Sequence, residues 1–256
     1  MIAEHGLAAI MPRTAAGVDW TGATFDLGDR KGRWQLITPS FEWRVFERLS
    51  LFAALPFGRV DLDDSAGGGY GLGDLSVSGK ATLVATPHGG FLLSAGLGAE
   101  LPTGDADNGF GGGHVELIPF VAASSAFYEG GRLALVAYGM AALRGSVGAD
   151  HPEDEHGAGT VSHVHGPAAG SVVAPHAERE GYARAMLAAV LGSFDVGTGG
   201  EGAVVFAGKG PGHLGWRAEA GYLLNESVRL HTAVDLGLLG ERRYGVRGRL
   251  GAAWLF

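Results

Sequence analysis

A group of histidines is the densest collection of metal-binding side chains in the sequence. Five His and six carboxylates lie within Asp150–Glu180. Neutral imidazole and carboxylate oxygens are good ligands for zinc and copper. One interpretation is therefore a zinc or copper site formed by His151, His156, His163, His165 and His176. These residues have no fixed ligand spacing, and the many Gly, Ala and Pro around them are typical of a solvated loop without metal, so both interpretations stay open.

Catalytic motifs are absent from the sequence. There is no Cys, which excludes a thiolate nucleophile, and neither Gly-x-Ser-x-Gly nor His-Glu-x-x-His occurs. Asp105, Asp107 and Glu116 match part of a calcium-loop template, but Phe110 stands where that template needs Gly. We predict a plain outer loop there, and we predict that the protein is not an enzyme.

The other charged side chains recur at every second position of apolar segments. In Val228–Leu238, for example, His231 and Asp235 lie on one side and Val and Leu on the other. Period-two alternation is the pattern of a β-strand with one apolar and one polar face. The polar faces together predict an interior set of charges, lining a solute path, that comprises Glu42, Arg44, Asp74, Lys80, Glu100, Arg217, Glu219, His231, Asp235, Arg243, Arg247 and Arg249.

Two interpretations of this interior set stay open. Opposite charges on neighbouring strands can pair across the interior and hold the strand register, or they can line a narrow, partly plugged passage. The last strand also predicts a positively charged wall, made of Arg243, Arg247 and Arg249 near Arg217, Arg229 and His231.

The character of the two faces favours a membrane barrel over a soluble sandwich. A sandwich carries its charges on the solvent face and fills its inner face with large residues, whereas the polar face here is rich in Gly and Ser. A closed barrel with lipid outside leaves no backbone group unpaired in hydrocarbon. The aromatic girdles of such a barrel are predicted at Phe41, Trp43, Trp216, Tyr222, Tyr244, Trp254 and Phe256.

The two-faced segments define the fold class. We predict one domain over residues 1–256, all-β, a transmembrane antiparallel up-and-down β-barrel of about twelve strands. The strands are expected at 13–27, 33–46, 49–63, 72–86, 90–104, 113–127, 132–146, 181–194, 200–209, 213–224, 228–239 and 243–256. Short turns, one of them at Asp195–Gly199, and both chain ends are then periplasmic. The longer loops lie outside, the longest being the His-rich loop at about 147–180.

Composition supports this fold and excludes other classes. Gly accounts for 46 of the 256 residues, well above the usual ~7%. No apolar run approaches the ~20 residues of a membrane-spanning helix, which excludes a helical membrane protein. The net charge of −8, without a Lys/Arg cluster, excludes nucleic acid as a partner.

Four stretches carry a resemblance to a known family. They are Phe41–Phe57 (FEWRVFERLSLFAALPF), Gly71–Leu83 (GLGDLSVSGKATL), Leu93–Asp105 (LSAGLGAELPTGD) and the last strand, which ends on Phe256. In order and spacing they resemble the outer-membrane transporter family named for meta-pathway phenol degradation. The resemblance implies a barrel in the bacterial outer membrane and the uptake of small aromatic or hydrophobic compounds. Residues 147–212 carry no such resemblance.

The functional expectation has two forms. The first is an outer-membrane channel, embedded in the lipid bilayer and without a cofactor, for passive passage of small, apolar or aromatic solutes. The terminal Phe256 resembles the signal read by the outer-membrane insertion machinery, which makes that machinery an expected partner. The alternative is a non-transporting barrel that binds metal or a partner protein through its His-rich loop.

Overall fold

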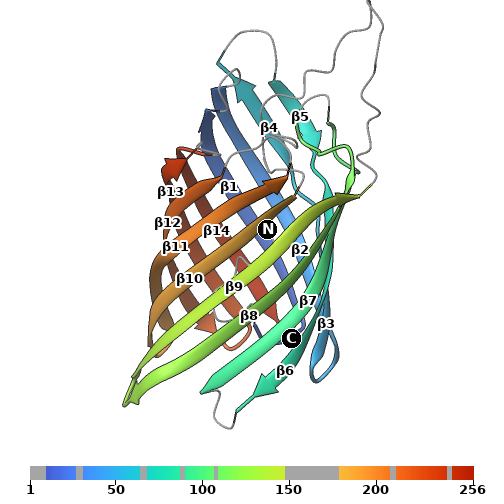
Figure 1. The fold of residues 1–256 in the computed structure, drawn as a ribbon. Coiled ribbons are helices and arrows are strands. Elements are labelled where there is room, and N and C mark those ends of the chain that lie inside the picture. Colours follow the sequence, from blue (N-terminus) through green and yellow to red (C-terminus); the bar gives the residue numbers. More distant parts are fainter. Residues whose placement is uncertain are drawn as a thin grey trace, which may run out of the picture.

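Every regular element in the described part of the chain is a β-strand. The computed structural model describes residues 10–26, 31–63, 68–86, 90–106, 109–147, 179–207, 212–240 and 244–256. Figure 1 shows the strands, which are β1 (Ala15–Asp26), β2 (Lys31–Phe46), β3 (Leu49–Ala54), β4 (Phe57–Leu62), β5 (Gly68–Leu72), β6 (Leu75–Ala85), β7 (Phe91–Leu101), β8 (Val115–Gly130), β9 (Leu133–Val147), β10 (Arg179–Leu191), β11 (Phe194–Ala207), β12 (His213–Asn225), β13 (Val228–Gly240) and β14 (Val246–Leu255). No helix long and apolar enough to cross a membrane is found among the described residues.

The strands form one antiparallel sheet that closes on itself. From β6 to β14 each strand pairs with the next, and β1 pairs with both β14 and β2. Within the described residues the ring consists of twelve strands, namely β1, β2, β3 and β6 to β14, while β4 and β5 extend the third and fourth of these at one end. The predicted twelve-stranded antiparallel barrel is confirmed.

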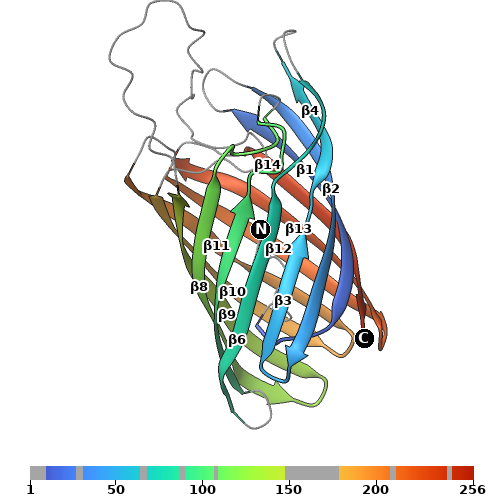
Figure 2. The same cartoon turned by 90° about the vertical axis from the view of Figure 1, so that its right-hand side faces the viewer.

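The two ends of the barrel differ in how they connect the strands. Short turns join β2 to β3, β8 to β9, β10 to β11 and β12 to β13 at one end, near which the C-terminus lies. At the opposite end β4, which pairs with β5, projects beyond the ring (Figure 2), and the described part of the connection between β7 and β8 lies at this end too. We refer to these as the turn end and the loop end.

Two predicted strands are each interrupted in the structure. The strand predicted at 49–63 is divided into β3 and β4 at Leu55–Pro56, because proline has no N–H to donate to a neighbouring strand. The strand predicted at 72–86 begins earlier, as β5, and resumes as β6 after Gly73 and Asp74.

One predicted turn is wrong. The sequence predicted a turn at Asp195–Gly199, but β11 runs through these residues and the chain turns at Gly192, where φ is +62°. A Cβ atom at Gly199 would lie 2.0 Å from the backbone oxygen of Ala185 on the neighbouring strand. Glycine is therefore needed there for the close approach of two strands rather than for a turn.

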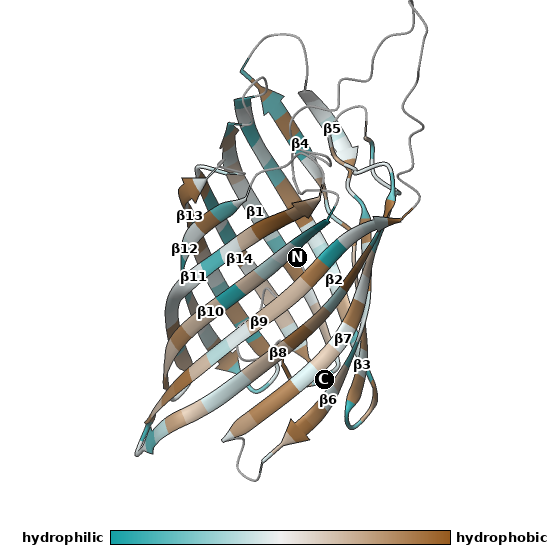
Figure 3. Ribbon diagram, in the orientation of Figure 1, coloured by the Kyte–Doolittle hydropathy of each residue, from teal (hydrophilic) through white to brown (hydrophobic). Residues whose placement is uncertain are grey.

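Apolar side chains cover the outside of the barrel. On β14, Val246, Leu250 and Trp254 are 44–55% exposed, whereas Arg249 faces inward and is 2% exposed. Figure 3 shows the brown, apolar residues recurring along β7, β8 and β9. Six of the seven predicted girdle aromatics are exposed on the outer face or at its rim. The prediction for Tyr244 is wrong: it is buried, since it precedes β14 and does not follow the alternation of that strand.

Candidate functional site: the barrel interior

The interior of the barrel is rich in buried charge. A buried charge is stable only when an opposite charge and hydrogen bonds compensate the loss of water, so these side chains are expected to be paired. Among the described residues, the buried charged side chains are Asp19, Glu42, Lys80, Glu100, Glu116, Glu180, Arg184, Glu201, Arg217, Asp235 and Arg249.

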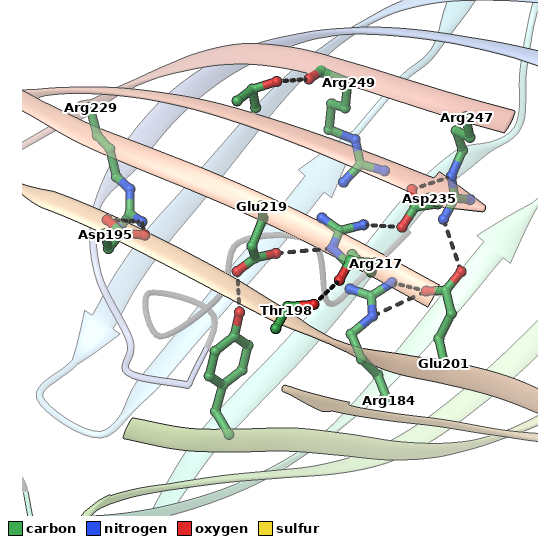
Figure 4. A network of polar contacts seen from close by, with 12 residues as sticks. Arg184, Asp195, Thr198, Glu201, Arg217, Glu219, Arg229, Asp235, Arg247 and Arg249 are labelled. Atoms are coloured by element: carbon green, nitrogen blue, oxygen red, sulfur yellow. Dashed lines mark hydrogen bonds and ion pairs between the residues drawn. The ribbon is translucent and has the colours of Figure 1, made fainter. Parts of the chain in front are cut away.

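A continuous chain of ion pairs crosses β10 to β14 (Figure 4). Arg184 Nη2 lies 2.6 Å from Glu201 Oε2, and Glu201 Oε1 lies 3.3 Å from Arg247 Nη2. Asp235 then bridges two arginines, with Oδ2 2.8 Å from Arg247 Nε and Oδ1 2.9 Å from Arg217 Nη1. The strand register brings these groups together, because Arg184 lies opposite Glu201, and Asp235 lies between Arg217 and Arg247 on adjacent strands.

Glu219 completes this network, which we call the charge belt: Arg184, Glu201, Arg217, Glu219, Asp235 and Arg247. Arg217 Nε lies 2.9 Å from Glu219 Oε2, and Tyr138 donates a hydrogen bond to the same carboxylate. Glu201 accepts further hydrogen bonds from Tyr182, at 2.8 Å, and from Tyr244. Three arginines therefore face three carboxylates, and the charge of the belt is balanced.

Three arginines of the predicted positive wall, Arg217, Arg229 and Arg247, are paired with carboxylates. Arg217 and Arg247 share Asp235, and Arg229 lies 2.8 Å from Asp195. Arg243 lies outside the described residues.

A second group of charges lies toward the loop end, on β7, β8 and β9. Arg144 bridges Glu100 at 3.3 Å and Glu116 at 3.2 Å. His114 Nε2 lies 3.2 Å from Glu116 Oε1 and 3.0 Å from Ser146 Oγ. The hydrogen bond with Glu116 raises the pKa of His114 above its usual value, and the nearby charges of Glu116 and Asp74 act in the same direction, while partial burial opposes them.

A third group holds the N-terminal segment inside the barrel. Glu42 lies 3.1 Å from Lys80 Nζ and 3.3 Å from Arg13 Nε. Lys80 also donates a hydrogen bond to the backbone oxygen of Met11, and Ser94 donates one of 2.6 Å to that of Ile10. Residues 10–13 therefore lie against the inner face of β2, β6 and β7. Burial lowers the pKa of Arg13, although the charge of Glu42 opposes the shift.

An apolar and aromatic cluster occupies the interior at the loop end. It consists of Ala23, Phe25, Trp34, Leu36, Val60, Phe110 and Tyr244, all 7% exposed or less. Tyr244 joins this cluster to the charge belt, because its hydroxyl bonds Glu201 and the guanidinium carbon of Arg247 lies 4.3 Å from its ring centroid.

Phe110 reaches the apolar cluster from the connection between β7 and β8. We call the described part of this connection, residues 102–106 and 109–114, the mouth loop. Asp74 accepts hydrogen bonds from the backbone N–H groups of Gly104, at 2.9 Å, and Gly112, at 2.7 Å. The outer loop predicted here therefore folds into the barrel mouth, where Phe110 is 1% exposed.

The structure places the remaining predicted residues as follows. Glu42, Lys80, Glu100, Arg217, Asp235 and Arg249 are buried in the interior, where the first five belong to the groups above. His231 lies 2.5 Å from Asp19. Arg44 is exposed, and its backbone N–H bonds Thr14 Oγ1.

The predicted metal ligands His151, His156, His163, His165 and His176 lie outside the described residues. Within the described residues, no group of three or more His, Asp and Glu is placed to hold a metal ion.

Sequence reasoning missed several interior residues. Arg184 and Tyr182 share the inner face of β10 with Glu180, so alternation along that segment contained the signal. Glu201 lies in the predicted strand 200–209, but the glycines on both sides of it gave no alternation that would assign it to the polar face. Phe110 lies in a loop, where no alternation exists to reveal its burial.

An antiparallel barrel with an apolar outer face, a closed ring of strands and a buried, ion-paired interior defines a bacterial outer-membrane β-barrel protein. The chain belongs to the family described as the putative MetA-pathway of phenol degradation, whose sequence profile matches residues 22–163, more than half of the chain. Three of the four stretches that carried the resemblance lie within this match, and the terminal strand lies beyond it.

Solved structures share the fold. A COG4313 outer membrane channel from Pseudomonas putida F1 superposes with a TM-score of 0.67 and 18% identity, covering 96% of both chains. The β domain of the Bordetella autotransporter BrkA gives 0.58 and 12% identity, covering 95% of this chain and 100% of that one. The KdgM porin gives 0.55 and 9% identity, covering 94% and 99%. Among curated proteins, no sequence matches this chain.

Proposed function

We propose that the protein is an outer-membrane channel through which small, apolar or aromatic solutes diffuse passively, with the loop end facing outward. The observation that carries the proposal is the order of the groups in the interior. The aromatic cluster lies at the loop end, and the charge-balanced belt lies further inside the barrel. The shared fold with an outer membrane channel and a porin supports the channel role, and the proposal involves no catalytic step.

The charge belt argues against a passage for ions or sugars as the main role. Arg184, Glu201 and Asp235 are 8% exposed or less and are committed to each other or to neighbouring groups. Paired groups offer little attraction to an ion or a polar solute, because its lost hydration would have to be replaced by groups that are already satisfied.

The aromatic cluster supplies the affinity for apolar solutes. The rings of Phe25, Trp34 and Tyr244 lie among Leu36 and Val60, which is the mostly apolar lining with a few polar groups typical of small-molecule sites. A solute leaving water at the loop end would gain apolar burial before it meets the belt.

Uptake in cells tests the proposal. Bacterial cells without their own porins would express the barrel or an empty vector, and the entry of radiolabelled toluene would be compared with that of glycerol. We expect the barrel to accelerate toluene entry several-fold and glycerol entry little.

Equal acceleration of both compounds would contradict the apolar specificity and indicate a hydrophilic pore. Acceleration of neither would contradict transport. The alternative would then be the non-transporting barrel, and zinc or copper titration of the protein, with and without its five loop histidines, would test that role.

A further inference from the structure

The Phe110 ring is surrounded by residues from other parts of the chain. We call the position that the ring fills, together with the residues around it, the Phe110 seat. Its walls come from the strands, through Phe25, Trp34 and Val60, and from Tyr244 just before β14. Phe110 alone among the cluster residues comes from the mouth loop. Withdrawal of this loop would therefore leave an apolar, ring-lined cavity among residues held mainly by the strands.

The glycine at position 71 shows how closely the seat fits a ring. A Cβ atom at Gly71 would lie 2.5 Å from Phe110 Cδ2 and 2.9 Å from Cε2. Any side chain at this position would collide with the ring, so the glycine leaves the space that the ring fills. Gly71 begins the GLGDL stretch that contributed to the family resemblance.

The same stretch and the ELPTGD stretch hold the mouth loop in place. Thr103 Oγ1 accepts a hydrogen bond of 2.8 Å from Leu75 N, and Asp105 N donates one of 3.0 Å to Leu72 O. Together with the two bonds to Asp74, these contacts form a latch, in which the side chains of Asp74 and Thr103 and the backbone oxygen of Leu72 accept hydrogen bonds from backbone N–H groups. None of these residues belongs to the apolar cluster that surrounds Phe110.

Trp34, which belongs to the same buried cluster as Phe110, carries a hydrogen-bond donor without a partner. The indole Nε1 of Trp34 is buried and has no acceptor among the described residues. Phenylalanine cannot supply an acceptor, whereas a ring bearing a hydroxyl or other oxygen substituent can. A buried donor left unpaired is costly, and an oxygen on the bound ring would remove this cost.

We propose that the Phe110 seat is a binding site for a single-ring aromatic compound that carries an oxygen substituent, and that Phe110 is a tethered occupant which the solute displaces. This proposal rests on the proposed channel function and deepens it by locating the aromatic solute. The site lies between the loop end and the charge belt, so a solute entering it has passed the mouth.

Competition with Phe110 sets the expected effect of a substitution. A tethered ring that leaves its seat only ~0.1–10% of the time weakens the apparent affinity of a competing ligand by the inverse of that fraction. Phe110→Ala removes the competitor and keeps the walls. We therefore expect phenol to bind Phe110→Ala at least ~10-fold more tightly than the wild-type barrel.

The experiment is isothermal titration of the detergent-folded barrel with phenol and with cyclohexanol. These compounds share the hydroxyl and differ in aromaticity, and edge-to-face contacts with the seat aromatics favour phenol by a few-fold to about tenfold. Phe206→Ala is the matched control, because Phe206 lies on β11 and is 65% exposed on the outer face. It is expected to bind phenol as the wild type does.

A second variant guards against a folding defect in the first. Asp74→Asn weakens the latch but keeps both ring and seat, so it is expected to bind phenol more tightly than the wild type and less tightly than Phe110→Ala. Equal phenol affinity in all four proteins would overturn the proposal, and so would equal affinity of Phe110→Ala for phenol and cyclohexanol.

The outcome is separable from that of the uptake experiment. Tighter phenol binding by Phe110→Ala without accelerated toluene entry into cells would support the seat and contradict the channel. Accelerated entry without any binding difference would support the channel and contradict the seat.

Discussion

Asp235 is a carboxylate whose loss should strongly damage the charge belt. Its carboxylate is 0% exposed and contacts Arg217 and Arg247 at 2.9 and 2.8 Å. Asp235→Asn keeps the shape but leaves both arginines without their shared counter-ion. Removing one partner of a buried ion pair costs about 3–5 kcal/mol, so the free energy of unfolding is expected to fall by about that amount.

Asp61 provides a matched control on the surface. It too contacts two arginines, Arg33 at 3.3 Å and Arg59 at 2.6 Å, but their side chains are more than half exposed. Exposed ion pairs contribute about 0–1 kcal/mol, so Asp61→Asn should change stability little.

The assay is urea-induced unfolding of each variant in lipid vesicles, followed by tryptophan fluorescence. A loss of the same size in both variants would refute the idea that burial makes the belt structural. A second readout is the reversal potential in a planar bilayer under a salt gradient. Asp235→Asn leaves surplus positive charge in the belt, so any ion current should shift toward anions, whereas Asp61→Asn should leave selectivity unchanged.

Three further predictions concern other parts of the barrel. The raised pKa of His114 means that its pairing with Glu116 is fully present below about pH 6.5 and is lost as the pH rises through the folded-state value; conductance noise from the mouth should therefore increase as the pH is raised above neutral, and His114→Gln should abolish that dependence. Gly199→Ala should destabilise the barrel by about 1–3 kcal/mol in the same urea assay, whereas Gly248→Ala, where a Cβ atom meets nothing within 4 Å, should be tolerated; equal effects would contradict the close-approach argument. Phe256→Ala should lower the yield of heat-modifiable barrel in cells without changing refolding in detergent, and an unchanged cellular yield would argue against recognition by the insertion machinery.

The alternation of the strands made much of the fold predictable. Lipid outside and charge inside require every second residue of a membrane strand to change character, and Val228–Leu238 and the last strand show this clearly. The same parity placed Arg217, Asp235 and Arg247 on inward faces. Their mutual contacts follow from the register of adjacent strands, which the sequence of a single strand does not determine.

The rest of the interior was hidden for physical reasons. The glycines before Glu201 have no side chains to report a face, so the start of β11 resembled a turn. Phe110 and Tyr244 lie outside regular strands, and their burial depends on contacts with residues distant in the sequence. The seat of Phe110 is visible only once Gly71 and Trp34 have been brought together by the sheet.

The seam between β1 and β14 joins the two ends of the chain, with Ala15 opposite Leu255 and Ala23 opposite Arg247. Contacts so far apart in sequence carry the largest loop-closure entropy and are expected to form late in folding. Until then β1 and β14 are open edges that can pair with another chain. Ser94 and Lys80 hold Ile10 and Met11 inside the finished ring, so the residues just before β1 lie within the ring that β1 itself closes with β14. Docking of this segment and closure of the seam therefore depend on the same strand, β1, and we expect the two events to be coupled.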